Sequence, residues 1–204
     1  MHPKMAALLA LTAFVVPAIA RADAAPTCGR LALALVVDRS GSMTGQPLDN
    51  AKAAGSAAVD RLGTSDCVTV ITFDSAPTTV VALHPLSDPN AVKAAIARIQ
   101  AGGGTEIGSA IDVAHKSLLT ATAARKKHIL LLTDGQSPTA GLQQLAQTMS
   151  IEHMTLSTVG FGSSTDEQTL KMLASTTSGR YYRVTDATAL AGVFSREVDR
   201  VLAP

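Results

Sequence analysis

Two aspartates and three hydroxyl side chains stand where strands or glycine-rich turns are predicted to end. Asp38 follows the apolar run LALALVV, and Ser40 and Ser42 come after it in the segment DRSGSM. Asp134 follows a second apolar run, KHILLLT, and Thr105 follows three consecutive glycines. Carboxylate and hydroxyl oxygens are hard donors that suit Mg²⁺ or Ca²⁺, whereas Zn²⁺ favours histidine and cysteine. These five residues are therefore candidate metal ligands.

The alternation of the first three candidates favours convergence on one point. Asp38, Ser40 and Ser42 are separated by single residues in a tight loop, so their side chains can face the same side. A site with neutral hydroxyls and only two carboxylates would leave a divalent ion electrophilic, with an exchangeable position. An aspartate or glutamate of a partner protein would be a natural further ligand.

The same residues allow other interpretations. Haloacid-dehalogenase-like phosphohydrolases also place a nucleophilic aspartate, with Mg²⁺ beside it, after a first apolar strand. The alternative function is thus a magnesium-dependent phosphohydrolase with Asp38 as nucleophile. Those enzymes use a second aspartate two residues later for acid–base work, and Ser40 stands there instead. A simple helix cap explains less, because the next helical pattern begins only near Pro47.

Composition narrows the class of protein. The 204 residues are enough for one domain with a sizeable core. The net charge is +1, from 17 basic and 16 acidic residues, and the chain lacks the basic stripe of a nucleic-acid partner. Hydrophobic residues make up 47% but aromatic residues only 3%, which favours the aliphatic core of a layered α/β protein.

Strand and helix patterns alternate along the chain. Continuous apolar or β-branched runs predict six strands, at 31–38, 67–74, 78–86, 127–135, 154–162 and 180–186. Helical spacing predicts six helices, at 47–62, 88–100, 107–120, 140–150, 166–177 and 187–202. The link between the second and third strands is too short for a crossover, so this pair should be antiparallel. The predicted fold is a doubly wound α/β open sheet. If its order is 3-2-1-4-5-6, Asp38 and Asp134 flank the switch point where ligands bind.

The amino terminus and the two cysteines indicate the compartment. A basic start, an apolar run and small residues near Ala20 to Ala24 predict a signal peptide at 1–24, followed by a domain at 25–204. The mature protein should be periplasmic or secreted, without stable membrane insertion. In an oxidising compartment Cys28 and Cys67 favour a disulfide, although two unpaired buried thiols remain an alternative.

Three segments in order carry a family resemblance: DRSGSM after an apolar strand, GGGTEIGSAI and LLLTDG. Together they resemble a von Willebrand factor type A (VWA) domain with a complete metal-ion-dependent adhesion site. The resemblance covers about residues 30–202. It is closest to exported bacterial VWA proteins and to the VWA domain of inter-alpha-trypsin-inhibitor heavy chains, through phrases such as DRSGSMTGQPLDNAK and VGFGSSTDEQTL.

The resemblance implies the ligand set and the function. The ligands would be Asp38, Ser40, Ser42, Thr105 and Asp134, holding Mg²⁺ (or Ca²⁺ or Mn²⁺). The ion would recruit an acidic side chain of another protein, usually without catalysis, so we expect a binding module and not an enzyme.

Three further expectations concern residues outside this set. The side chain of Arg39 should point away from the metal and either attract an acidic partner or remain solvated. The histidines after His2 should be ordinary surface or strand-edge residues. Ser164 or Thr165 should cap the helix at 166–177.

Overall fold

A six-stranded sheet forms the centre of the molecule. The computed structural model describes residues 27–204, so the predicted signal peptide lies outside the described residues. The strands are β1 (Leu31–Asp38), β2 (Cys67–Phe73), β3 (Pro77–Pro85), β4 (Lys126–Thr133), β5 (Met154–Phe161) and β6 (Tyr181–Val184). They follow the order β3-β2-β1-β4-β5-β6, and only β3 pairs antiparallel within this sheet. The predicted doubly wound α/β sheet with one antiparallel strand is confirmed, and its strand order is the one under which Asp38 and Asp134 flank the switch point.

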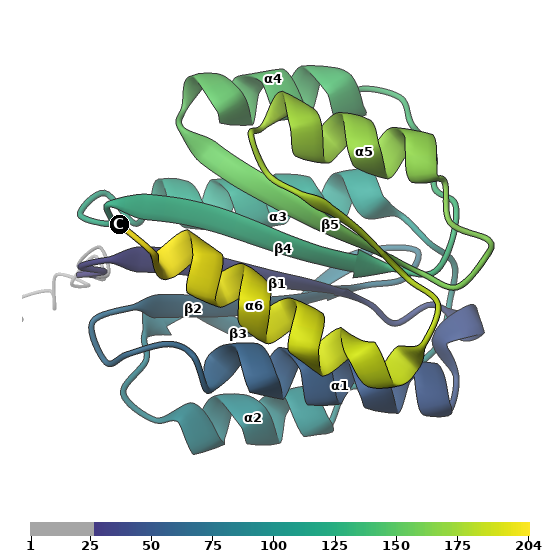
Figure 1. Cartoon of the computed structure of the whole chain (residues 1–204), viewed down its shortest axis with the longest axis horizontal. Coiled ribbons are helices and arrows are strands. Elements are labelled where there is room, and N and C mark those ends of the chain that lie inside the picture. The colour runs from purple at the N-terminus through teal and green to yellow at the C-terminus, as the bar shows by residue number, and fades with distance from the viewer. Residues whose placement is uncertain (1–26) are drawn as a thin grey trace, which may run out of the picture.

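Helices cover both faces of this sheet, as Figure 1 shows. One face carries α1 (Gln46–Val59), α2 (Pro89–Ala97) and α6 (Leu190–Leu202), and the other carries α3 (Ile107–Leu119), α4 (Leu142–Ile151) and α5 (Glu167–Thr176). The final helix begins later than predicted, because a short 3-10 turn at Ala187–Ala189 precedes it.

Side chains cap the starts of α2, α3 and α5, whereas α1, α4 and α6 begin without a side-chain cap. Asp88 accepts hydrogen bonds from the backbone N–H groups in the first turn of α2. The expected cap of α5 is wrong: Asp166 accepts a hydrogen bond from the Thr169 N–H, and neither Ser164 nor Thr165 serves. The helix begins at Glu167, which leaves Asp166 directly before the first helical residue.

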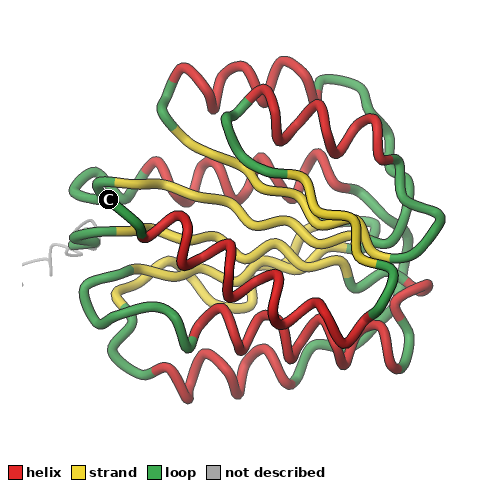
Figure 2. The backbone as a smooth tube through the Cα atoms, viewed as in Figure 1, coloured by secondary structure: helices red, strands yellow, loops and turns green. Residues whose placement is uncertain are grey.

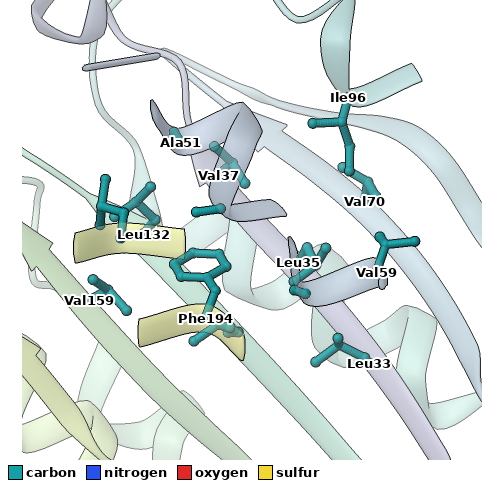
Figure 3. Packing of buried hydrophobic residues seen from close by; sticks show 14 of the residues in the cluster. Leu33, Leu35, Val37, Ala51, Val59, Val70, Ile96, Leu132, Val159 and Phe194 are labelled. Atoms are coloured by element: carbon teal, nitrogen blue, oxygen red, sulfur yellow. The ribbon is translucent and has the colours of Figure 1, made fainter. Parts of the chain in front are cut away.

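Aliphatic side chains fill both layers between helices and sheet. All eight residues of β1 are buried, as expected for a central parallel strand covered on both faces. Figure 3 shows one layer, in which the ring of Phe194 on α6 lies among Leu35, Leu132 and Val159 of three strands. This rigid sheet fixes where the carboxyl ends of β1 and β4 lie.

The two cysteines form a disulfide. Cys28 and Cys67 are bonded and fully buried, with their Cα atoms 5.3 Å apart. The bond joins the segment before β1 to the first residue of β2, because these parallel strands begin side by side. The expectation of a bridge is confirmed, and the alternative of two unpaired thiols is wrong.

A buried carboxylate on α6 is held by polar side chains of the sheet. Glu197 is fully buried and accepts hydrogen bonds from Ser157 Oγ at 2.6 Å, from Arg180 Nη1 at 3.1 Å and from the Tyr182 hydroxyl. His128 Nε2 lies 3.6 Å from the same carboxylate. These contacts stabilise a charge that would be costly if it were buried alone.

Two histidines contradict the expectation that all four are ordinary surface or strand-edge residues. His128 is 1% exposed on β4, and its Nδ1 lies 2.6 Å from Thr155 Oγ1. His115 is 7% exposed on α3, where its ring contacts Glu152. His115 lies on the buried face of α3, and His128 begins the continuously buried part of β4. The packing of each element therefore determines the exposure of these side chains, although both are polar.

Acid is expected to destabilise the protein through His128. Burial lowers the pKa of His128 from 6.5 to about 4, an effect that the charge of Glu197 opposes and that of Arg180 reinforces. Between these two pH values the unfolded chain binds a proton at this histidine that the folded chain does not. The free energy of unfolding should therefore fall, by about 3 kcal/mol from this group, as the pH drops from 6.5 to 4.

Urea denaturation at pH 7 and pH 4.5 measures this loss, and the His128→Gln variant is the control. Glutamine keeps polar atoms near Thr155 but does not titrate, so the stability of the variant should change less with pH. Equal losses in the two proteins would show that other groups cause the acid sensitivity.

Candidate metal site

The carboxyl ends of β1 and β4 meet at the switch point of the sheet. The two strands pair in parallel, with Val37 opposite Leu132, so Asp38 and Asp134 arrive at the same edge. Helices leave these strands toward opposite faces: α1 follows β1, and α4 follows β4. Figure 2 shows the loops that gather at this edge. The fold therefore places the two candidate carboxylates in one crevice, as doubly wound sheets do.

Hydrogen bonds connect four of the five predicted ligands. Asp38 Oδ1 accepts from the backbone N–H of Ser40 at 2.8 Å. Ser40 Oγ lies 3.1 Å from Ser42 Oγ, which donates to Asp134 Oδ1 at 2.8 Å. Asp38 is fully buried and Ser40 is 2% exposed, whereas Ser42 faces solvent. The cluster is thus anchored in the protein and open on one side.

Thr105, the fifth candidate, reaches the cluster from the loop before α3. A Cβ placed on Gly135 would lie 3.4 Å from Thr105 Oγ1, so this hydroxyl lies against the residue that follows Asp134. The glycine loop is tied to the first loop by two backbone bonds, from Gly41 N to Gly103 O and from Gly102 N to Arg39 O. The structure therefore brings all five candidates to one region, and their role as ligands stays a prediction.

Thr133 is a positioning residue that sequence reasoning missed. Its hydroxyl donates to Asp38 Oδ2 at 2.6 Å, and the residue is fully buried at the end of β4. This bond fixes the orientation of the Asp38 carboxylate. Only its place next to Asp134, on a strand paired with β1, could have indicated it. Thr44, the next hydroxyl of the first loop, instead donates to Gly41 O at 2.7 Å.

Arg39 is paired within the protein. Its guanidinium contacts the Asp74 carboxylate and donates to Gln100 O at 3.2 Å, with 28% of the side chain exposed. The side chain thus bonds to groups outside the candidate ligand set. Both expectations for the Arg39 side chain, that it is solvated or that it is available to an acidic partner, are wrong, because Asp74 already compensates its charge.

The two carboxylates of the cluster have no basic partner. Across residues 27–204, neither Asp38 nor Asp134 forms an ion pair with lysine, arginine or histidine. Burial raises the pKa of Asp134, and the charge of Asp38 raises it further, while the bond from Ser42 opposes both effects. Two uncompensated carboxylates surrounded by hydroxyl oxygens suit a hard divalent cation. The donor set therefore fits such an ion.

Hydroxyl groups are essential to this fit. In the part of the chain that the structure describes, no three His, Cys, Asp or Glu side chains form a metal-binding group. An ion at this edge would thus depend on Ser40, Ser42 and Thr105 as well as on the two aspartates. Such a mixed set excludes the nitrogen and sulfur coordination that structural zinc sites use.

Comparison with known proteins gives relatives of the same fold. A cyanobacterial protein, "Uncharacterized protein sll0103" of Synechocystis, is 34% identical over 152 residues, which are 73% of this chain and 36% of that protein. The chain therefore spans about a third of this relative's length. A von Willebrand factor type A protein from Catenulispora acidiphila superposes with a TM-score of 0.77 at 26% identity, over 85% of this chain and 43% of that one.

A second similar structure is described with a bound metal. Proximal thread matrix protein 1 from the mussel byssus, described with a zinc-occupied MIDAS motif, has a TM-score of 0.75 at 21% identity. The match covers 87% of this chain and 47% of the mussel protein. A model of the von Willebrand factor type A domain matches residues 32–196, which include every candidate ligand. The chain belongs to the von Willebrand factor type A domain family.

Proposed function

We propose that this protein is an exported binding module that uses a divalent cation to capture an acidic side chain of a partner protein. The observation that carries the proposal is the hydrogen-bonded chain Asp38–Ser40–Ser42–Asp134, which lacks a basic counter-charge. The ion would be Mg²⁺, Ca²⁺ or Mn²⁺, because every donor is an oxygen. The zinc-occupied motif of the mussel protein supports a divalent ion at such a site.

The residues of the cluster have distinct roles in this proposal. Asp38 and Asp134 supply the negative charge, and the hydroxyls of Ser40, Ser42 and Thr105 supply neutral oxygens. Thr133 holds Asp38 in place. A bound ion would offer a coordination position to an incoming carboxylate. The solvent-facing side of Ser42 leaves an approach for the partner.

The proposal does not include catalysis. Ser40 occupies the position at which a phosphohydrolase of the alternative type needs an acid–base carboxylate, and its hydroxyl is engaged with Ser42. No specific observation therefore favours Asp38 as a nucleophile over Asp38 as a ligand.

Export is supported by the covalent chemistry of the domain. A buried disulfide between Cys28 and Cys67 is typical of proteins in oxidising compartments. We propose a signal peptide at 1–24 and a mature domain at 25–204 that is periplasmic or secreted. Among the helices of the described residues, none has the length and apolarity needed to cross a membrane.

Divalent ions should stabilise the domain and switch on partner capture. An ion at about 100 times its Kd should raise the free energy of unfolding by about 2.7 kcal/mol, because it binds only the folded state. Thermal unfolding in Mg²⁺ and in EDTA measures this effect. A peptide array with single aspartates or glutamates, probed in both conditions, measures capture.

Matched peptides and a phosphatase assay separate the interpretations. Arrays that carry asparagine or glutamine in place of the acids should retain no protein in Mg²⁺. Equal melting temperatures in Mg²⁺ and EDTA would contradict a metal site. A phosphatase activity that disappears in Asp38→Ala would support the alternative enzyme instead.

A further inference from the structure

A cavity lined largely by basic and polar residues lies at the edge of the sheet opposite the candidate metal site. It has a volume of about 270 Å³ and opens at the amino ends of β4 and β5, beside the last turn of α6. In Figure 1 this is the side on which the chain's C-terminal end lies. Its walls are formed by Arg125, Lys126, Lys127, His128, His153, Thr155, Ser178, Gly179, Arg180, Arg200 and Val201. None of the five candidate metal ligands lines this cavity.

The walls of this cavity concentrate positive charge. Five of the 17 lysines and arginines line it, and no aspartate or glutamate is among its lining residues. The whole chain has a net charge of only +1. Such a cluster in a concave, partly desolvated site attracts anions more strongly than scattered surface charges do.

Two of the five cations have no protein partner for their side chains. Within residues 27–204, Arg125 and Lys127 form neither a side-chain hydrogen bond nor an ion pair. Lys126 is engaged, since its Nζ donates to the carbonyl oxygens of Val201 and Ala203 at the end of α6. Two positive charges of the cavity are therefore uncompensated.

The two arginines are only partly engaged. Arg180 Nη1 donates to the buried Glu197 carboxylate, and Arg200 Nη1 donates to the Tyr182 hydroxyl at 2.9 Å. About half of the Arg180 side chain remains exposed. Each guanidinium carries five N–H donors in a planar fork, so both retain donors for a further acceptor.

A buried imidazole nitrogen completes the wall. His128 is 1% exposed, and its Nδ1 is occupied by Thr155, but its Nε2 is buried without a hydrogen-bond partner. The nearby Glu197 Oε1, at 3.6 Å, is too far for a hydrogen bond. Buried polar atoms are normally paired, so an unpaired nitrogen in a cavity wall is itself evidence for a missing ligand.

We propose that this cavity binds a phosphate group. A phosphate carries nearly two negative charges and at least three acceptor oxygens, which match several cationic donors around one small space. A carboxylate offers one charge and two oxygens, and would leave more of these donors unpaired. The phosphate can be free inorganic phosphate or the monoester headgroup of phosphatidic acid, since both present a terminal phosphate with at least three free oxygens.

Calorimetric titration of the full chain with inorganic phosphate at constant ionic strength tests the proposal. Saturable binding is expected, and the Lys127→Gln variant should bind about tenfold more weakly, because it loses one charged hydrogen bond. Arg125→Gln, at an exposed position, provides the same test if Lys127→Gln folds poorly. Phosphate should also shift the ring signals of His128 in NMR spectra, and acetate should not.

The Arg196→Gln variant is the matched control, because Arg196 is an exposed arginine of α6 outside the cavity. It should bind phosphate like the unmodified protein. Co-sedimentation with phosphatidic acid vesicles, lost in Lys127→Gln, would identify a lipid headgroup as the source. Saturable phosphate binding without vesicle binding would identify the free anion. Absence of both, or equal weakening by Arg196→Gln, would overturn the proposal.

Discussion

The Asp38→Asn variant is expected to lose Mg²⁺ binding and, with it, capture of acidic peptides. The affinity should fall by more than about 100-fold, because even the loss of an outer partner of a ligand typically costs about 10–100-fold. Asparagine keeps the size of the side chain and can still bond to Thr133 and to the Ser40 N–H. Calorimetry with Mg²⁺ and the peptide array measure the two losses.

The same variant should fold normally, which separates ligation from structural damage. Its metal-free form should be within about 1 kcal/mol of the unmodified protein in urea denaturation, because removing one charge also relieves the repulsion on Asp134. Asp112→Asn is the control: Asp112 is a carboxylate of α3 that pairs with Lys116 at 2.6 Å. Unchanged Mg²⁺ affinity in Asp38→Asn would remove Asp38 from the ligand set.

The Gly103→Ala variant is expected to weaken metal binding without touching any ligand. Gly103 has a φ of 78°, in the left-handed region, and a Cβ there would lie 2.8 Å from the Cβ of Asp74. The loop must therefore move, and it carries Thr105 two residues later. We expect Mg²⁺ affinity to fall by about 10–100-fold and stability by roughly 1–3 kcal/mol.

Gly102→Ala provides a neighbouring control in the same loop. A Cβ at Gly102 has no heavy atom within 4 Å, and its backbone is outside the left-handed region. This variant should bind Mg²⁺ and unfold like the unmodified protein. If both alanine variants bind the ion normally, the loop does not position a ligand, and Thr105 would leave the proposed set.

The fold could be predicted because its signals are local. The run at 31–38 is apolar throughout, and every residue of β1 is buried. The link between the second and third strands has only three residues, so this pair must be antiparallel. The alternation of the other strands with helices indicated that they pair in parallel. The proximity of Asp38 and Asp134 then follows from strand order alone, since the ends of neighbouring parallel strands must meet.

Long-range polar contacts could not be predicted in the same way. The pairing of Arg39 with Asp74 joins two loops whose approach depends on the packed structure. Glu197 did leave a signal: it continues the buried face of α6 set by Val193 and Phe194. Its partners Ser157 and Arg180 lie on other elements, and neither residue type indicates such a pairing by itself.

The disulfide has a consequence for the orientation of the domain on any support. Cys28 is bonded to the start of β2, and Lys126 holds the carbonyl groups at the end of α6, so the first described residues and the end of α6 lie at the same edge. A tether attached directly before Cys28 or directly after α6 would therefore leave from the side that carries the basic cavity. The cavity would face the anchoring surface, and the metal edge would be displayed outward, at the far tip of the domain.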